Sequence, residues 1–100
     1  MSAATVLASS CEFLSDPKHW HQGDFHSADE KAFCAIGTIM RYAQPDSPDY
    51  WHAVDALGAA IGPYSGPISI TAWNDDPDRQ HSEVVEAFQR ALALAVSNES

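Results

Sequence analysis

Apolar residues recur at spacings of three and four along this chain, and this periodicity limits the fold more than any other feature. Such spacing places side chains on one face of an α-helix. In the first stretch the apolar stripe is Leu7, Cys11 and Leu14, and it ends near Asp16-Pro17. We therefore expect the chain to begin with an amphipathic helix.

The motif Ser27-Ala28-Asp29-Glu30 predicts the start of a second helix. A serine followed three residues later by a glutamate can form a capping box, in which each side chain binds the backbone amide of the other residue. Further along, Cys34, Gly37 and Thr38 form a track of small residues, where we expect another part of the backbone to approach closely. The apolar face of this helix is Phe33, Ile36, Gly37, Met40 and Ala43.

Two further helices are predicted in the second half of the chain. Ser47-Pro48-Asp49 places a serine cap, a proline and a carboxylate at the first turn of a helix, where each of them is favourable. This helix ends at Gly62-Pro63, and another runs from about Gln80 or Ser82 to Val96. Their inward faces are Tyr50, Val54, Leu57 and Ile61 in the first, and Val84 or Val85, Phe88, Leu92 and Val96 in the second.

Residues 68–73 are predicted to be extended. Apolar and polar residues alternate there, as in a half-buried strand that follows a loop over residues 64–67. This segment could pair with residues around Phe25 in a two-stranded ribbon. The expected fold is mainly α, a compact single helical domain over residues 1–100 with about four helices and one or two short extended segments. An α+β arrangement is the alternative.

The charge of the chain restricts its partners. Fourteen acidic residues against five lysines and arginines give a formal net charge of −9. This charge repels phosphate backbones and anionic membranes, so we expect neither nucleic acid nor a membrane as partner, and it attracts basic proteins. We expect the N-terminal residues to form neither a signal peptide nor a membrane span, and Cys11 and Cys34 lack the spacing of a disulfide scaffold. We expect reduced thiols and a cytoplasmic location.

Trp73-Asn74-Asp75-Asp76 is interpreted as a structural turn. Trp73 is expected to be a buried anchor, and the Asn74 and Asp75 side chains are expected to bind backbone amides two residues on. Asp78 or Ser82 would then cap the last helix. A calcium loop is disfavoured, because its central glycine and correctly placed bidentate glutamate are missing.

Two chemical alternatives use cysteine and histidine. Cys34 with His52 or His81, and with Asn74 or Asp75 as the orienting group, has the residue types of a thiol enzyme. However, the predicted helix start at Ser27 places Cys34 two turns into the helix, where the dipole no longer lowers a thiol pKa. A non-enzymatic role is therefore favoured.

A metal site is the second alternative. His19, His21 and His26, with Cys34 or His81, supply ligand types that zinc prefers. No second tight pair of ligands completes a closed site, so we expect no metal and no other cofactor.

Aromatic and acidic residues predict a binding surface for a protein. Tryptophan and tyrosine dominate protein interfaces, and here they occur in an acidic chain. The predicted binding residues are Trp20, Tyr50, Trp51, Asp46, Asp49 and Asp55.

Several blocks of the sequence resemble a family of small uncharacterised proteins from actinobacteria and their phages. That family shares a Cys-Ala-x-Gly-Ala block and a late Trp-Asn-Asp block; Thr38 stands here where it favours alanine, and Gln80 where a capping threonine is common. The resemblance implies an actinobacterial or phage origin, but no activity or cofactor. The matching residues are Trp20, Gln22-Gly23, Cys34-Ala35-Ile36-Gly37-Thr38, Ala72-Trp73-Asn74-Asp75, Glu83-Val84-Val85 and Arg90-Ala91.

The sequence favours an acidic protein-interaction module as the function. A small acidic phage protein would act by binding a host protein, and the charge favours a basic partner. Self-association into a homodimer is left open. The alternatives are a cysteine-dependent enzyme that uses Cys34 with His81 or His52, and a small metal-binding protein.

Overall fold

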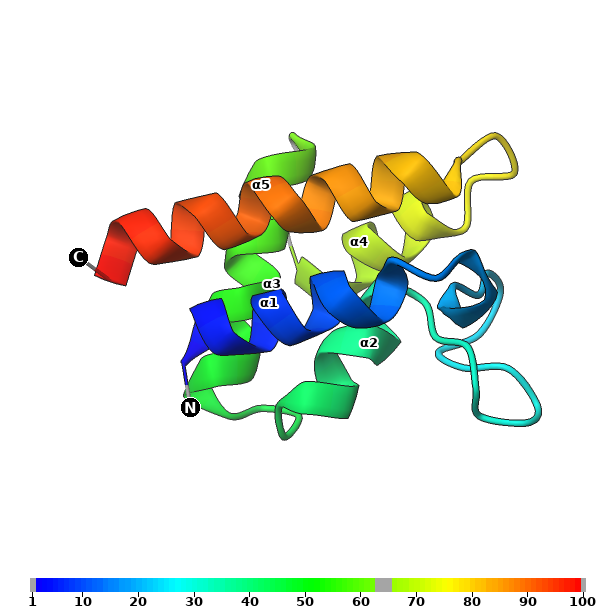
Figure 1. The fold of residues 1–100 in the computed structure, drawn as a ribbon, viewed down its shortest axis with the longest axis horizontal. Coiled ribbons are helices and arrows are strands. Elements are labelled where there is room, and N and C mark those ends of the chain that lie inside the picture. Colours follow the sequence, from blue (N-terminus) through cyan, green and yellow to red (C-terminus); the bar gives the residue numbers. More distant parts are fainter. Residues whose placement is uncertain (1, 63–65, 100) are drawn as a thin grey trace.

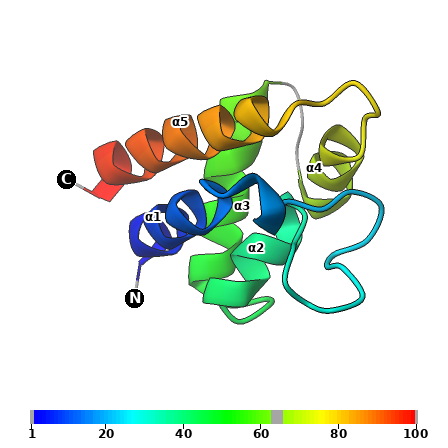
Figure 2. The ribbon, with the colours of Figure 1, turned by 45° about the vertical axis from the view of Figure 1, so that its right-hand side comes forward.

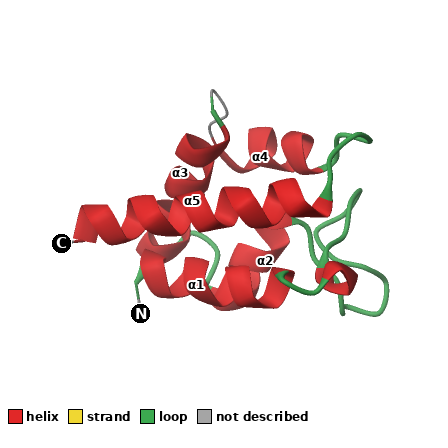
Figure 3. Ribbon diagram, turned by 45° about the horizontal axis from the view of Figure 1, so that its top comes forward, coloured by secondary structure: helices red, strands yellow, loops and turns green. Residues whose placement is uncertain are grey.

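The fold consists of five α-helices in the part of the chain that the structure describes, which is residues 2–62 and 66–99 of a computed structural model (Figure 1). Figure 3 shows helices and loops in those residues and no strand, which confirms the predicted mainly helical fold. The helices are α1 (Ala3–Leu14), α2 (Ala35–Tyr42), α3 (Pro48–Ile61), α4 (Gly66–Asn74) and α5 (His81–Glu99), with a short 3₁₀ turn, η1 (Pro17–His19), after α1.

The longest helix, α5, has 19 residues and packs against both α1 and α3. Figures 1 and 2 show α1 and α5 lying side by side while α3 crosses behind them. The segments that lead into α2 and out of α4 gather at the opposite end of the molecule from the C-terminal end of α5 (Figure 1). Two loops that are far apart in the sequence are therefore neighbours.

The core receives buried side chains from every helix. Complete burial of one aliphatic or aromatic side chain contributes roughly 1.5–3 kcal/mol, so a few such residues per helix hold a small fold together. The predicted inward positions of the first and third helices are confirmed by the burial of Leu7, Leu14, Val54 and Leu57. The largest fully buried apolar side chains are Phe88, Leu7, Leu14, Ile36, Ile39, Leu57 and Ile70.

The predicted start of the third helix is confirmed. The Ser47 side chain accepts a hydrogen bond from the backbone amide of Tyr50 at 3.2 Å, and Pro48 is the first residue of α3. The helix ends at Ile61, where Gly62 adopts a φ of 107° that other residues disfavour. Of the predicted loop over residues 64–67, Tyr64 and Ser65 lie outside the described residues. The prediction is wrong for Gly66 and Pro67, which are the first two residues of α4.

The predicted start of the second helix at Ser27 is wrong, because α2 begins at Ala35. The Ser27 hydroxyl donates to the Asp29 carboxylate at 2.6 Å and accepts from the Ala32 amide at 3.1 Å. The hydrogen bond from Ser27 lowers the pKa of Asp29, with a further contribution from the amide of Lys31. Glu30 has a φ of 58°, which is left-handed and not helical. The side chains expected to cap a helix therefore close a loop.

The predicted strand at residues 68–73 is also wrong, because this segment forms most of α4. Ile70, Trp73 and Asn74 are buried at spacings of three and four, whereas Ile68 is 87% exposed. The short alternating pattern also fits one buried face of a helix, and tertiary packing decided between the two. No ribbon joins Phe25 to Ile70 in the described chain, where the isolated bridges link Phe33 to Trp20 and to His26.

The last helix is longer than predicted, and its inward face differs in part. Val84 and Phe88 are buried as expected and Leu92 is partly buried, but Val96 is 52% exposed. Alanines take the remaining inward positions of α5, which packs on both α1 and α3. These alanines are Ala87, Ala91 and Ala95.

The predicted close approach at the small-residue track is confirmed at Gly37. The backbone of Phe25 lies against this glycine, and a Cβ atom added at Gly37 would overlap the Phe25 carbonyl oxygen. That carbonyl also accepts a hydrogen bond from the Cys34 amide at 3.0 Å. Gly37 therefore allows the loop before α2 to pack directly on the helix.

We predict that Gly37→Ala lowers the free energy of unfolding by about 2 kcal/mol, because the loop must move away from the helix. At an open helical position the same change would stabilise the protein by roughly 0.5–1 kcal/mol, so the sign of the effect is diagnostic. Urea denaturation followed by circular dichroism measures it. A stabilised variant would show that Phe25 does not pack on Gly37.

Candidate functional site

The buried amide of Asn74 joins three segments of the chain. Its Oδ1 atom accepts hydrogen bonds from the Trp20 indole at 2.8 Å and from the Ala35 backbone amide at 3.0 Å. Its Nδ2 atom donates to the His21 carbonyl at 3.1 Å and to the Asp75 carboxylate at 3.0 Å. The full hydrogen-bonding capacity of the amide is used. One side chain at the end of α4 thus caps the start of α2 and holds the loop that precedes it.

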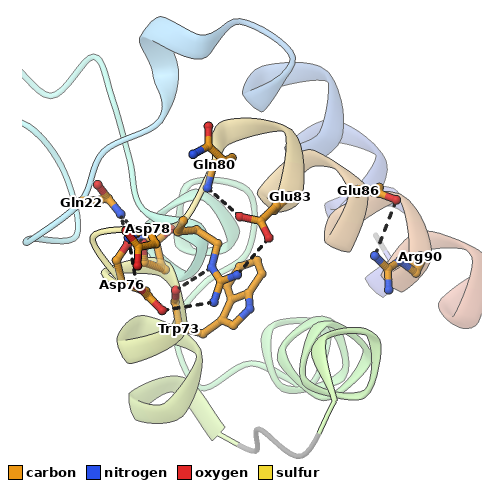
Figure 4. Close-up of polar contacts among 10 residues, drawn as sticks. Gln22, Trp73, Asp76, Asp78, Gln80, Glu83, Glu86 and Arg90 are labelled. Atoms are coloured by element: carbon orange, nitrogen blue, oxygen red, sulfur yellow. Dashed lines mark hydrogen bonds and ion pairs between the residues drawn. The ribbon is translucent and has the colours of Figure 1, made fainter.

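Neighbouring contacts clamp the same loop to the end of α4. The Gln22 amide donates to the backbone carbonyls of Asn74 at 2.9 Å and Asp76 at 2.8 Å, and Figure 4 shows Gln22 reaching toward Asp76. The Asp75 carboxylate accepts from the Gly23 amide at 3.0 Å. Asp75 therefore binds a residue of the distant loop. The predicted hydrogen bond to an amide two residues on cannot form, because that residue is Pro77, which has no N–H group.

Trp73 is buried, as predicted, and Arg79 covers it. The Arg79 guanidinium carbon lies 4.3 Å from the centroid of the Trp73 ring, and its Nε atom donates to the Trp73 carbonyl at 3.0 Å. The same guanidinium contacts the Glu83 carboxylate at 3.3 Å. Cation–π, hydrogen-bond and ionic contacts together fix the turn between α4 and α5.

The cap of the last helix comes from a residue that the sequence did not indicate. The Glu83 carboxylate accepts a hydrogen bond from the Gln80 amide at 2.8 Å (Figure 4). We had expected Asp78 or Ser82 to cap this helix. Asp76 instead forms a turn before this helix, because its carboxylate accepts a hydrogen bond from the Asp78 amide at 2.9 Å.

The outward face of α3 carries two of the predicted binding residues. Trp51 is 40% exposed, and Asp55 lies one turn further along the same face together with the exposed His52. Asp49 lies on the flank of the helix and Asp46 lies before it. We call Trp51, His52, Asp55 and Ala59 the α3 outward face.

The other predicted aromatic contacts do not form part of that face. Tyr50 is only 5% exposed, and its ring packs edge-on against Trp51 with the centroids 5.0 Å apart. Burial raises the pKa of Tyr50, and the charge of Asp46 adds to the increase. Trp20 is half-buried because its indole binds Asn74. Of the three predicted aromatic binding residues, Trp51 is therefore exposed, whereas Tyr50 and Trp20 face inward.

A groove of about 470 Å³ lies beside the α3 outward face, between α3, α5 and the start of α1. Most of its lining is apolar and small, and Leu94 is 41% exposed there. Sequence reasoning missed this groove, although the alanines at i and i+3 in α3 were a signal for it. The lining residues are Ala3, His52, Asp55, Ala56, Ala59, Leu94 and Ala95.

The charge around this groove is acidic. No lysine or arginine occurs between Arg41 and Arg79, a stretch that contains the whole of α3 and α4. Within the described residues, none of Asp46, Asp49 and Asp55 forms an ion pair. Asp49 and Arg41 line another groove together without forming an ion pair.

A family model for a family of unknown function, DUF6197, matches residues 1–94. The chain belongs to this family. No curated protein matches it, and no solved structure does. The two sequence blocks that suggested a family of uncharacterised proteins meet in this DUF6197 fold, since the Asn74 amide of the Trp-Asn-Asp block binds Ala35 of the Cys-Ala-x-Gly block. Both blocks have structural roles.

Cys34 is the N-cap residue of α2, so the expectation that it lies two turns inside a helix is wrong. Its Sγ atom is buried and accepts a hydrogen bond from the Gly37 amide at 3.3 Å. Burial raises the pKa of the Cys34 thiol, and the Asp75 carboxylate adds to the increase, while the amides of Gly37 and Ile36 oppose it. The net direction favours the neutral thiol, whereas a catalytic cysteine needs the thiolate.

The candidate histidines are engaged elsewhere. His81 bonds the Leu14 carbonyl and His19 bonds the Phe13 carbonyl at 2.6 Å, so both satisfy the carbonyl end of α1. His52 lies on the α3 outward face, and neither His52 nor His81 has a hydrogen bond to Cys34. His26 bonds the Ser27 carbonyl at 2.8 Å.

The described residues do not gather three or more His, Cys, Asp or Glu side chains where they could hold a metal ion. His19, His21 and His26 therefore do not converge on one point. Over the same residues, the helices are all too short or too polar to cross a membrane.

We predict that Asn74→Ala lowers the free energy of unfolding by about 3 kcal/mol. The substitution leaves the Trp20 indole, the Ala35 amide and the His21 carbonyl without their partner, and each unsatisfied buried group is costly. Chemical denaturation measures the loss, with the exposed Gln89→Ala as the matched control. A variant as stable as the control would refute the central role of Asn74.

We predict that Cys34 alkylates slowly in the folded protein and that Cys11 reacts first, since Cys11 is only half-buried. The pKa of both thiols is raised, so the thiolate fraction at neutral pH is below that of a free cysteine, and the labelling rate should still be rising with pH above about 8.5, where a free cysteine levels off. Iodoacetamide labelling followed by mass spectrometry measures this. Rapid labelling of Cys34 below pH 7 would instead indicate an activated thiol.

Proposed function

We propose that this DUF6197 protein is an acidic protein-interaction module that binds a basic amphipathic helix of a partner protein. The observation that carries the proposal is the groove of about 470 Å³ at the α3 outward face, with Asp55 in its lining and the exposed Trp51 one helical turn before Asp55. The groove provides an apolar contact area, and the aspartates favour a positively charged partner.

The shape of the groove favours a helix as the bound element. Its walls are two helices, α3 and α5, and small alanine side chains leave space for the ridge of a third helix. Recognition of a helix in a groove relies on apolar anchors at intervals of three and four residues. Leu94 and Trp51 are the exposed large apolar residues that such anchors would contact.

The charge favours a basic partner. A protein with a formal net charge of −9 accelerates its encounter with a positively charged surface and slows its encounter with an acidic one. A homodimer through this groove is less favourable, because two copies of α3 would bring their aspartates together. Sedimentation at low and high salt would reveal such a dimer if it formed.

The biological setting is part of the proposal. The resemblance to proteins of actinobacteria and their phages supports a host protein as the partner. The free thiols of Cys11 and Cys34 support a reducing compartment, which in bacteria is the cytoplasm. We propose that the protein acts there by occupying a basic helix of a host protein.

We predict that the protein binds an amphipathic leucine–lysine peptide of about 18 residues, and that Trp51→Ala weakens this binding about tenfold. Ala59→Leu, which fills the groove, should have a similar effect. Fluorescence anisotropy of the labelled peptide measures both dissociation constants. A leucine–glutamate peptide of the same pattern should not bind.

Matched controls separate this site from general charge attraction. Asp55→Lys and Asp24→Lys make the same change in net charge, but only Asp55 lines the groove. Ala8→Leu adds the same side chain as Ala59→Leu at an exposed position of α1. If Asp24→Lys weakens binding as much as Asp55→Lys does, the α3 outward face is not the binding site. The same variants, used as bait in actinobacterial lysate, would identify the partner.

A further inference from the structure

Arg41 lies in a cluster of aromatic rings at the end of α2. Its guanidinium carbon is 4.5 Å from the centroid of the Phe13 ring, 5.4 Å from that of Phe33 and 5.7 Å from that of Tyr42. Phe13 is held in turn by His19, which stacks on it with the centroids 4.2 Å apart. The rings hold the flat face of the guanidinium, and a stacked guanidinium keeps the N–H groups at its edge available.

Arg41 differs from the other arginines in its lack of an acidic partner. Arg79 pairs with Asp76 and Glu83. Arg90 pairs with Glu86, as Figure 4 shows. Within the described chain no carboxylate lies within ion-pair distance of Arg41, whose one hydrogen bond there is the 3.4 Å contact of Nε with the Tyr42 hydroxyl. This is unusual, because the protein has fourteen acidic residues and a formal net charge of −9.

A groove of about 260 Å³ opens beside this guanidinium. Its lining is mainly apolar, and Phe25 is 49% exposed. Met40 and Arg41 also line a second groove, to which Asp49 contributes a carboxylate. No carboxylate lines the groove beside the guanidinium, and the nearby Glu30 carboxylate lies 4.0 Å from the His26 ring nitrogen Nε2. The floor is fixed where the Phe25 backbone packs on Gly37. The lining residues are Phe25, His26, Phe33, Gly37, Met40 and Arg41.

We propose that Arg41 and this groove bind a small apolar carboxylic acid. The carboxylate receives hydrogen bonds from the edge of the guanidinium, and the apolar body lies between Phe25, Phe33 and Met40. A carboxylate matches the planar, forked arrangement of guanidinium donors. The single arginine also favours a monoanion over a phosphate dianion, because the rest of the protein repels negative charge. This site is separate from the α3 outward face, and the proposal does not rest on the proposed function.

Phenylacetate, phenylacetamide and phenethylamine test the proposal, because they share one apolar body and differ in the charge of the head group. We expect saturable millimolar binding of phenylacetate, with shifts of the Met40 methyl and Arg41 Nε resonances in nuclear magnetic resonance spectra. Phenylacetamide should bind at least about fivefold more weakly, and phenethylamine should not bind. Equal dissociation constants for phenylacetate and phenylacetamide would overturn the proposal.

Two arginine variants make the test specific. Arg41→Gln and Arg90→Gln remove the same charge from exposed positions, but only Arg41 lines the groove. Arg41→Gln should weaken phenylacetate binding at least about fivefold while Arg90→Gln leaves it within twofold. Thermal unfolding confirms that both variants fold. Equal effects of the two variants would assign the binding to general charge. If N-acetylphenylalanine binds more tightly than phenylacetate, the proposal of a small free acid is wrong. The ligand would then be the C-terminus of a peptide.

Discussion

The Asn74 amide is the interaction on which the rest of the structure depends. It is fully buried, and it links Trp20, the following loop and the first amide of α2 to the end of α4. A buried amide with all its donors and acceptors satisfied specifies one arrangement of its neighbours, because any other arrangement leaves polar groups unpaired. The start of α2, the path of the loop and the position of Cys34 follow from it.

This network explains the two sequence blocks without invoking catalysis. Trp73 anchors α4 beneath Arg79, Asn74 caps α2, and Gly37 gives the loop room to pack. In the described residues every buried side-chain nitrogen and oxygen has a hydrogen-bond partner. The region where the two blocks meet is therefore held by satisfied polar contacts, and the two surfaces that we propose for binding lie elsewhere.

Two such surfaces differ in charge. The α3 outward face belongs to a stretch without lysine or arginine, and the adjoining groove is walled by alanines. The groove at Arg41 has an arginine without an acidic partner and no carboxylate in its lining. An acidic protein can keep both kinds of site because charge acts over a short distance in physiological salt, roughly 8 Å. The first surface suits a basic helix, and the second suits a small acid.

The sequence by itself determined the helices whose signals are local. The stripe in α1, the Ser47 cap of α3 and the Val84 and Phe88 positions of α5 depend on residues within a few turns. The close approach at Gly37 was also predictable, because only glycine lacks the Cβ atom that would prevent it.

Only the tertiary structure decided the features that depend on distant residues. The capping motif at Ser27 could not reveal that Asn74, 39 residues beyond Ala35, caps α2 instead. The alternation in residues 68–73 is compatible with a strand as well as with a helix. Tertiary packing selects the helix, because it buries Ile70 and Trp73 on one side of α4. The burial of Trp20 likewise depends on a distant residue, because its indole binds Asn74, whereas Trp51 is 40% exposed. Local patterns state what a segment can form, and contacts between distant segments select among those possibilities.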